Sequence, residues 1–139
     1  MVLIIGATGY VGRYLSIYLK EQGYDVLALG RSKKVQEFFK ENGVPFQHFD
    51  LSDDESFNQL PTENIEAVID LSACLAEHET PVEKFFEVNT IGVYKMLEFC
   101  RKNGIKKFLL SHRRSPFIVQ IDALIMCPRP WFPSICRVF

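Results

Sequence analysis

The chain has 139 residues, 47% of them hydrophobic and 24% charged, with a formal net charge of −1 at pH 7. This length fits one domain, the composition excludes a mainly disordered chain, and the charge excludes a globally basic nucleic-acid binder. The charge is uneven: residues 1–111 hold 12 Lys and Arg against 16 Asp and Glu, whereas residues 112–139 hold four Arg against one Asp. Residues 112–139 also contain four of the seven prolines and the single Trp, so we expect this segment to differ in origin or role.

Targeting signals and cysteine spacing predict the compartment. Met1 is followed by a short apolar run that no basic region precedes, so we expect no secretory signal. The four cysteines form no Cys-x-x-Cys pair and no metal-ligand pattern with the histidines, which favours reduced thiols and no metal site. The longest apolar stretch near the end is about half the roughly 20 residues of a membrane-spanning helix. The sequence therefore predicts a soluble, cytoplasmic protein without a membrane partner.

Short apolar segments alternate with amphipathic segments over the first 111 residues. The short segments have the length and character of strands buried on both faces of a parallel sheet. They are Val2–Ile5, Asp25–Leu29, Phe46–Phe49, Ala67–Leu71 and Lys107–Leu110. The longer segments have helical spacing and are Tyr10–Gln22, Lys33–Asn42, Ser52–Leu60 and Pro81–Asn103. This alternation predicts an α/β fold with a doubly wound parallel sheet of about five strands.

Local signals mark helix starts and the end of this alternation. Ser52, with Glu55 three residues later, predicts a capping box that begins the third helix at Ser52. After Ser111 the alternation stops, and the prolines from residue 128 onward exclude a regular helix or a central strand. Phe117–Ile125 is compatible with one more strand. We expect the remainder of residues 112–139 to form an irregular tail.

Three glycines separate the first strand from the first helix, in Gly6-Ala-Thr-Gly-Tyr-Val-Gly12. Gly6 allows a sharp turn, Gly9 lets a pyrophosphate approach the backbone, and Gly12 lets the helix pack close to the sheet. The N–H groups at the start of the helix attract phosphates. The loop therefore predicts a dinucleotide site. A glycine-rich turn without a ligand is the alternative, which the position between a strand and an amphipathic helix disfavours.

The Gly-x-x-Gly-x-x-Gly spacing resembles that of the short-chain dehydrogenase/reductase superfamily. It looks most like the extended branch of NAD(P)-dependent epimerases, dehydratases and reductases that act on nucleotide sugars. Phe49-Asp50-Leu51 is similar to the Asp-Leu pair whose carboxylate meets the adenine amino group. Val68–Ala73 resembles the fourth strand and the turn beside the cofactor, and Phe86–Gly92 and Lys106–Ser111 resemble the following helix and fifth strand. The resemblance covers residues 1–111 and implies a Rossmann-type fold.

The end of the second strand indicates which nicotinamide cofactor is preferred. NAD-preferring sites carry an acid here to hold the ribose 2′-OH, but this chain has Arg31, Ser32 and two lysines before Glu37. An Arg can hydrogen-bond a 2′-phosphate, and such a charged bond contributes about 1.5–3 kcal/mol. We predict a preference for NADP(H) over NAD(H), the alternative being that these cations only solvate the second helix. With the resemblance, the cofactor-binding residues are expected to be Gly6, Thr8, Gly9, Tyr10, Val11, Gly12, Arg31, Ser32, Lys33, Asp50, Leu51, Leu71, Ser72 and Ala73.

Two features depart from the family's pattern. Asp70 stands where the family more often has His or Asn, and we expect a satisfied carboxylate that hydrogen-bonds the neighbouring loop. Arginines replace the small residues expected after Ser111, and no Tyr-x-x-x-Lys pair follows, since the last tyrosine is Tyr94 and the last lysine is Lys107. Because the family's hydride transfer uses that pair, we predict no catalytic residues and no activity of this chain alone.

Two hypotheses about function remain open. In the first, residues 1–111 are a truncated NAD(P)-binding domain of an extended reductase or epimerase, and residues 112–139 are a frameshift product or disordered. In the second, the chain is a non-catalytic module that senses NADP(H) or binds a protein, with the tail covering the sheet edge or forming a homodimer contact. The expected partners are the dinucleotide and, in the intact parent, a nucleotide sugar or similar small molecule. We expect no nucleic-acid partner, although the arginines and Trp131 of the tail are compatible with RNA binding.

Overall fold

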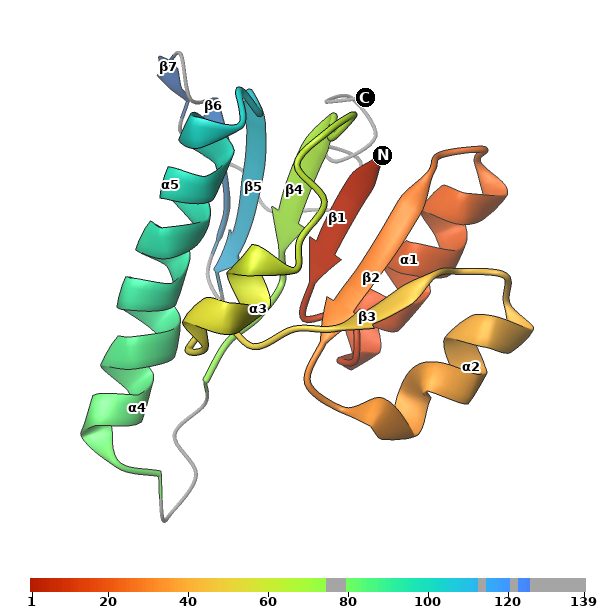
Figure 1. Cartoon of the computed structure of the whole chain (residues 1–139), viewed down its shortest axis with the longest axis horizontal. Coiled ribbons are helices and arrows are strands. Elements are labelled where there is room, and N and C mark those ends of the chain that lie inside the picture. The colour runs from red at the N-terminus through yellow and green to blue at the C-terminus, as the bar shows by residue number, and fades with distance from the viewer. Residues whose placement is uncertain (75–79, 113–114, 121–122, 126–139) are drawn as a thin grey trace.

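A computed structural model describes residues 1–74, 80–112, 115–120 and 123–125, and the side chains of residues 1–74 and 80–111. The strands form one sheet in the order β3-β2-β1-β4-β5-β6-β7 (Figure 1). The first five are β1 (Val2–Ile5), β2 (Val26–Gly30), β3 (Phe46–His48), β4 (Ala67–Asp70) and β5 (Lys107–His112). All pairings among these five are parallel, so the predicted doubly wound parallel sheet is confirmed.

The helices cover both faces of the sheet (Figure 1). One face carries α1 (Tyr10–Glu21) and α2 (Gln36–Glu41), which follows a 3₁₀ turn at Lys33–Val35. The other face carries α3 (Asp54–Asn58) and one continuous helix built from α4 (Val82–Phe86), η2 (Glu87–Gly92) and α5 (Val93–Lys102). The η2 segment is a π-helix, a feature that is frequent at functional sites. Each predicted helix therefore has a counterpart, but the last one contains a π-helical interruption.

The start of α3 differs from the prediction. The N-cap is Asp53, whose carboxylate accepts a hydrogen bond from the Glu55 N–H at 3.1 Å. Ser52 instead donates its hydroxyl to Asp50 Oδ1 at 2.8 Å. The predicted capping box at Ser52 is therefore wrong, because the nearby carboxylate of Asp50 competes for the serine hydroxyl.

Strands β1 and β4 are buried on both faces, and β1 is the middle strand of the five parallel ones. Val2 and Ile4 pack with Leu15 and Leu19 of α1 on one face. Leu3 and Ile5 pack with residues of the α4–η2–α5 helix on the other face, among them Val88, Met96 and Cys100. Burial on both faces explains why these strands appear in the sequence as nearly continuous apolar runs.

Two antiparallel strands extend the sheet beyond β5. They are β6 (Ser115–Gln120) and β7 (Ala123–Ile125), where the sequence indicated one strand over Phe117–Ile125. β6 pairs with β5 from Lys107↔Gln120 to His112↔Ser115. A short connection between neighbouring strands favours this antiparallel direction, because a parallel pairing needs a crossover of a dozen or more residues. The rest of the expected irregular tail, residues 126–139, lies outside the described residues. No helix in the described ranges is long and apolar enough to cross a lipid bilayer.

Candidate functional site

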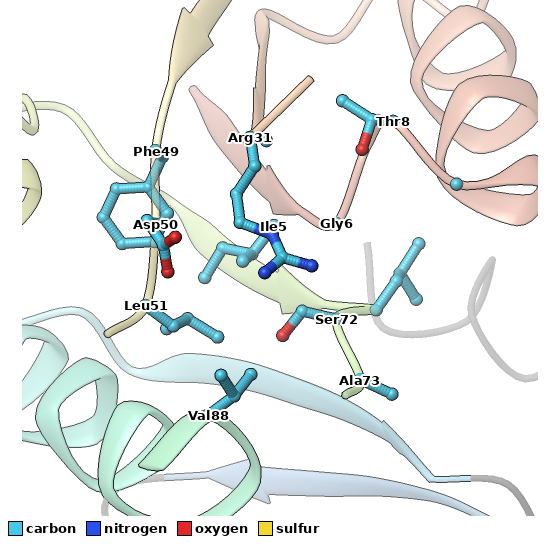
Figure 2. Close-up of a pocket in the computed structure, with 13 residues that line it drawn as sticks. Ile5, Gly6, Thr8, Arg31, Phe49, Asp50, Leu51, Ser72, Ala73 and Val88 are labelled. Carbon is cyan, nitrogen blue, oxygen red and sulfur yellow. The ribbon is translucent and has the colours of Figure 1, made fainter. Parts of the chain in front are cut away.

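A pocket of about 180 Å³ lies at the carboxyl ends of β1, β2 and β4 (Figure 2). β2 pairs with one edge of β1 and β4 pairs with the other edge, so the order in which the strands are added to the sheet reverses at β1. Ligands of open α/β sheets bind at such a switch point. The pocket is lined by Ile5, Gly6, Thr8, Gly9, Gly30, Arg31, Phe49, Asp50, Leu51, Leu71, Ser72, Ala73 and Val88.

The glycine loop forms one wall of the pocket. Gly6 turns the chain out of β1 with a φ of 75°, a left-handed conformation that only glycine adopts readily. A Cβ atom on Gly6 would lie 2.7 Å from the backbone nitrogen of Ser72, so the loop after β4 touches Gly6 directly. We call Gly6, Thr8 and Gly9 the glycine-loop wall.

The start of α1 has the properties of an anion site. Gly9 is the N-cap and offers no side-chain cap, and the first turn contains no acidic residue. The first N–H groups of a helix have no acceptor within the helix, so they are available to an anion that approaches Gly9. Gly12 allows a close approach between α1 and the loop that follows β1. A Cβ atom there would collide with the Gly6 carbonyl oxygen and with Ala7, so Gly12 packs against the loop itself.

The segment after β4 forms the facing wall, and two side chains hold it. Asp70 Oδ1 accepts hydrogen bonds from the Ser72 backbone N–H at 2.9 Å and from its hydroxyl at 2.6 Å. Asn89 of η2 accepts from the Cys74 N–H at 2.8 Å and donates to the Cys74 carbonyl at 2.9 Å. We call Leu71, Ser72 and Ala73 the β4 wall. Its position depends on side chains at both ends of this short segment.

Asp70 is an unusually buried carboxylate. Its relative exposure is 0%, and among the described residues its Oδ2 atom has no hydrogen-bond partner. Burial raises the pKa of Asp70 to about 6, although the hydrogen bonds from Ser72 oppose the shift. The expected hydrogen bond to the neighbouring loop is confirmed. The expectation that the whole carboxylate is satisfied is wrong for Oδ2, because this oxygen is buried away from water while both hydrogen bonds from Ser72 go to Oδ1.

A second carboxylate, Asp50, lies on the opposite side of the pocket. Its burial alone would raise the pKa, but hydrogen bonds from the Ser52 N–H and hydroxyl, with the charges of Arg31 and Lys84, hold it below the usual value. The Arg31 side chain points into the pocket, with its guanidinium group directed between Asp50 and Ser72 (Figure 2). The site therefore combines an ionised carboxylate, a cation and an uncapped helix terminus.

The structure brings together nine of the fourteen residues that the sequence assigned to the site. They are Gly6, Thr8, Gly9, Arg31, Asp50, Leu51, Leu71, Ser72 and Ala73. The other five do not line the pocket: Tyr10 and Val11 are 87% and 46% exposed, Gly12 lies under the loop, and Ser32 and Lys33 follow Arg31 on the surface. Whether these five contact a ligand that extends beyond the pocket stays a prediction.

Four lining residues were missed. Ile5 and Gly30 end their strands and Phe49 directly follows β3, so the rule that ligands bind at carboxyl ends could have found all three. Val88 had no such signal. It reaches the pocket from the π-helix, which the residue pattern of the helix does not indicate.

Comparison with known proteins identifies relatives of this chain. The model of the NAD dependent epimerase/dehydratase family matches residues 2–112. A UDP-glucose 4-epimerase of Halalkalibacterium halodurans is 27% identical over 137 residues, which cover 96% of this chain and 40% of that protein. A photosystem II assembly factor of a Synechocystis strain is 32% identical over 108 residues, which cover 78% of this chain and 32% of that protein.

A solved structure has the same fold. A structure described as a putative NAD-dependent epimerase/dehydratase from Bacillus halodurans superimposes with a TM-score of 0.65 at 27% sequence identity. The match covers 78% of this chain and 49% of the solved one. This chain thus spans less than half the length of these relatives, and residues 2–112, which the family model matches, contain the whole pocket.

Proposed function

The chain belongs to the NAD-dependent epimerase/dehydratase family, and we propose that residues 1–111 are the NAD(P)-binding portion of an extended epimerase, dehydratase or reductase. In the intact parent the substrate is a nucleotide sugar or a similar small molecule, as the name of the UDP-glucose 4-epimerase relative suggests. The single observation that carries this proposal is the pocket in which the uncapped start of α1, Asp50 and Arg31 meet.

The residues present fit a dinucleotide. The pyrophosphate is proposed to lie against the first turn of α1, where Gly9 leaves the backbone open and no acid repels it. Asp50 is proposed to accept a hydrogen bond from the adenine amino group, a role that suits a carboxylate held ionised. Leu71, Ser72 and Ala73 are proposed to contact the ribose and pyrophosphate. The bound nicotinamide would supply hydride transfer in the intact parent.

We also propose that the site prefers NADP(H). The support is local: β2 ends in Gly30, no acid occurs between it and Glu37, and Arg31 points into the pocket. An Arg can bind a 2′-phosphate with its planar donor fork, which no acid at this position could do.

Titration of the purified chain with NADPH and NADH tests both proposals. We expect NADPH to bind about tenfold to a hundredfold more tightly than NADH, as a charged hydrogen bond implies. Arg31→Met should remove most of this difference, whereas Lys20→Met, in the last turn of α1, should leave it unchanged. Failure to bind either dinucleotide would overturn the assignment, and equal binding would overturn the preference alone.

Residues 112–139 are proposed to have a different origin from residues 1–111. The match to the family model ends at residue 112, where the charge and proline content also change, whereas the alignment with the Halalkalibacterium halodurans epimerase continues beyond this residue. The chain contains no Tyr-x-x-x-Lys pair, so we propose that it has no catalytic residues and is inactive alone. Sequencing the gene across codons 108–116 and translating the other frames tests this. The idea fails if neither frame yields a run of small residues and a downstream Tyr-x-x-x-Lys.

A non-catalytic NADP(H)-sensing or protein-binding module is the second candidate. The 32% identical relative named as an assembly factor favours it. The outer side of the α4–η2–α5 helix also exposes Val82, Phe86 and Tyr94 by 77%, 59% and 62%, which suits a protein partner or a homodimer. Analytical ultracentrifugation of the chain and of a Val82→Ser/Phe86→Ser variant tests this. A wild-type monomer at all concentrations would contradict the homodimer.

The proposed location is the cytoplasm. Cys74 and Cys100 are free thiols in the structure, which suits a reducing compartment. Fractionation of cells that express the tagged chain would test this placement.

A further inference from the structure

A close contact links the end of β2 to the glycine loop. Gly30 is the last residue of β2, and both Gly30 and Thr8 line the pocket. A Cβ atom on Gly30 would lie 2.5 Å from Thr8 Cγ2, 3.2 Å from Thr8 Oγ1 and 3.3 Å from Thr8 Cβ. Non-bonded carbon atoms are normally 3.5–4.0 Å apart, so the methyl group of Thr8 occupies the space that a side chain at position 30 needs.

The backbone at Gly30 would otherwise accept a side chain. The residue belongs to a regular parallel strand, and Gly30 pairs with His48 of β3. Its carbonyl accepts a hydrogen bond from the Phe49 N–H at 3.1 Å, which fixes the strand end next to the Asp50 segment. The obstacle to substitution is therefore the contact with Thr8, and not the conformation of the chain.

Position 30 is important for the choice of cofactor. Sites that prefer NAD hold the ribose 2′-OH with an acid about 20 residues after the glycine loop, at the end of the second strand. Gly30 occupies this place, 21 residues after Gly9, and a carboxylate there would face the same pocket as Arg31.

We infer that Thr8 is a second determinant of cofactor choice, because its methyl group prevents an acidic side chain at position 30 from fitting. The inference rests on the proposed function and extends it. Arg31 favours a 2′-phosphate by attraction, and the Thr8–Gly30 pair disfavours the NAD type of site by exclusion. A change to NAD(H) preference therefore needs substitutions at positions 8 and 30 together, and neither alone suffices.

Melting temperatures test the steric part without any ligand. Gly30→Asp should lower the melting temperature by about 5 °C, as expected for overpacking in a chain of this size. Adding Thr8→Ser removes the methyl group and should restore most of this loss, whereas adding Thr8→Val keeps a methyl group there and should not. Ser32→Asp is the matched charge control, because it adds a carboxylate two residues away and should leave the melting temperature unchanged.

Calorimetric titration of the same proteins with NADPH and NADH tests the cofactor part. In Thr8→Ser/Gly30→Asp, the ratio of the two dissociation constants should move toward NADH by at least about tenfold, the size of one charged hydrogen bond. Thr8→Ser alone should keep the wild-type ratio. Gly30→Asp alone should bind both dinucleotides more weakly.

Each result that contradicts the expectations would overturn a different part of the inference. A Gly30→Asp protein that melts like the wild type, or that Thr8→Ser does not rescue, would overturn the steric part. Rescue of stability without a change in the ratio would overturn the role in cofactor choice. Failure of the wild-type chain to bind either dinucleotide would overturn the proposed function, and the melting temperatures would still decide whether Thr8 blocks position 30.

Discussion

The two walls of the pocket are held in place by opposite means. The glycine-loop wall depends on missing side chains, because a Cβ atom on Gly6 would collide with the backbone of Ser72. The β4 wall depends on side chains that are present, because Asp70 holds Ser72 and Asn89 holds Cys74 by hydrogen bonds. The first arrangement tolerates almost no added atom, whereas the second fails when a polar group is removed or titrated.

This difference explains which of the contacts that hold the two walls are visible in the sequence. Glycine spacing is local and is visible within seven residues. The bonds that hold Cys74 come from a residue 15 positions away, in a segment that becomes π-helical only in the folded protein. Four substitutions, taken in order of expected effect, test whether the two walls respond as differently as the contacts imply.

The largest effect is expected for Gly6→Ala. The positive φ costs about 1–2 kcal/mol for a residue with a Cβ atom, and the contact with Ser72 adds about 1–3 kcal/mol of overpacking. We expect the free energy of unfolding, measured in urea, to fall by about 2–5 kcal/mol.

Gly23→Ala is the control for this substitution. Gly23 also has a positive φ, of 87°, but a Cβ atom there would have nothing within 4 Å. Gly23→Ala should therefore lower the free energy of unfolding only by the conformational contribution, about 1–2 kcal/mol. Equal losses for the two variants would show that the contact between the walls contributes nothing.

Asp70→Asn should stabilise the protein at neutral pH. The folded-state pKa of about 6 lies above 3.8, the ordinary pKa of an Asp side chain, so the folded protein binds the proton more tightly than the unfolded chain. The resulting stability is present below pH 3.8 and is lost as the pH rises to about 6, a difference of about 3 kcal/mol. The variant should lack this dependence and should exceed the wild type by up to about 3 kcal/mol above pH 6.

Asp50→Asn should change the pH dependence of the free energy of unfolding with the opposite sign. The folded-state pKa of Asp50 is lowered, so its stabilising contribution is present at neutral pH and is lost as the pH falls through that lowered value. Urea unfolding of both variants from pH 2 to pH 8 measures the two slopes, since the Asp50 contribution changes below its ordinary pKa of 3.8 and the Asp70 contribution changes between 3.8 and about 6. If Asp70→Asn follows the wild-type pH dependence, the buried carboxylate does not destabilise the β4 wall.

Asn89→Ala should loosen the β4 wall by a smaller amount. It removes two hydrogen bonds to the Cys74 backbone, and because the amide is exposed each is worth about 0.5–1.5 kcal/mol. We expect a loss of about 2 kcal/mol and faster hydrogen exchange of the Cys74 amide, with unchanged exchange in the glycine loop. Asn103→Ala, which removes one bond to the Phe99 carbonyl, is the matched control and should not affect Cys74.

Lys95→Ala should have the smallest effect, because it touches neither wall. Its ammonium lies 2.6 Å from Asp54 Oδ1, but the Asp54 side chain is 81% exposed and water screens the pair. We expect a loss of about 0.5 kcal/mol that disappears at high salt. A loss comparable to that of Asn89→Ala would mean that α3 and α5 support the pocket, contrary to the comparison.

The sequence predicted the parallel sheet because buried strands and glycine-terminated helices carry local signals. The residues of the glycine loop follow directly from their spacing, whereas Asp50 was predicted from the resemblance of Phe49-Asp50-Leu51 to the family's Asp-Leu pair. The sequence did not predict Val88 in the pocket, the unpaired oxygen of Asp70 or the contact between Thr8 and Gly30. These features arise where segments distant in the chain pack together, so no periodicity within one segment could indicate them.

The antiparallel pairing of β6 with β5 has a practical consequence for attempts to rebuild an enzyme from this chain. The edge of β5 away from β4 is used by six residue pairs with β6. A separate polypeptide that supplies another parallel strand and a Tyr-x-x-x-Lys helix must first displace β6 from this edge. Fragment complementation should therefore start from a chain shortened to end at His112, in which the edge of β5 is free to accept the added strand.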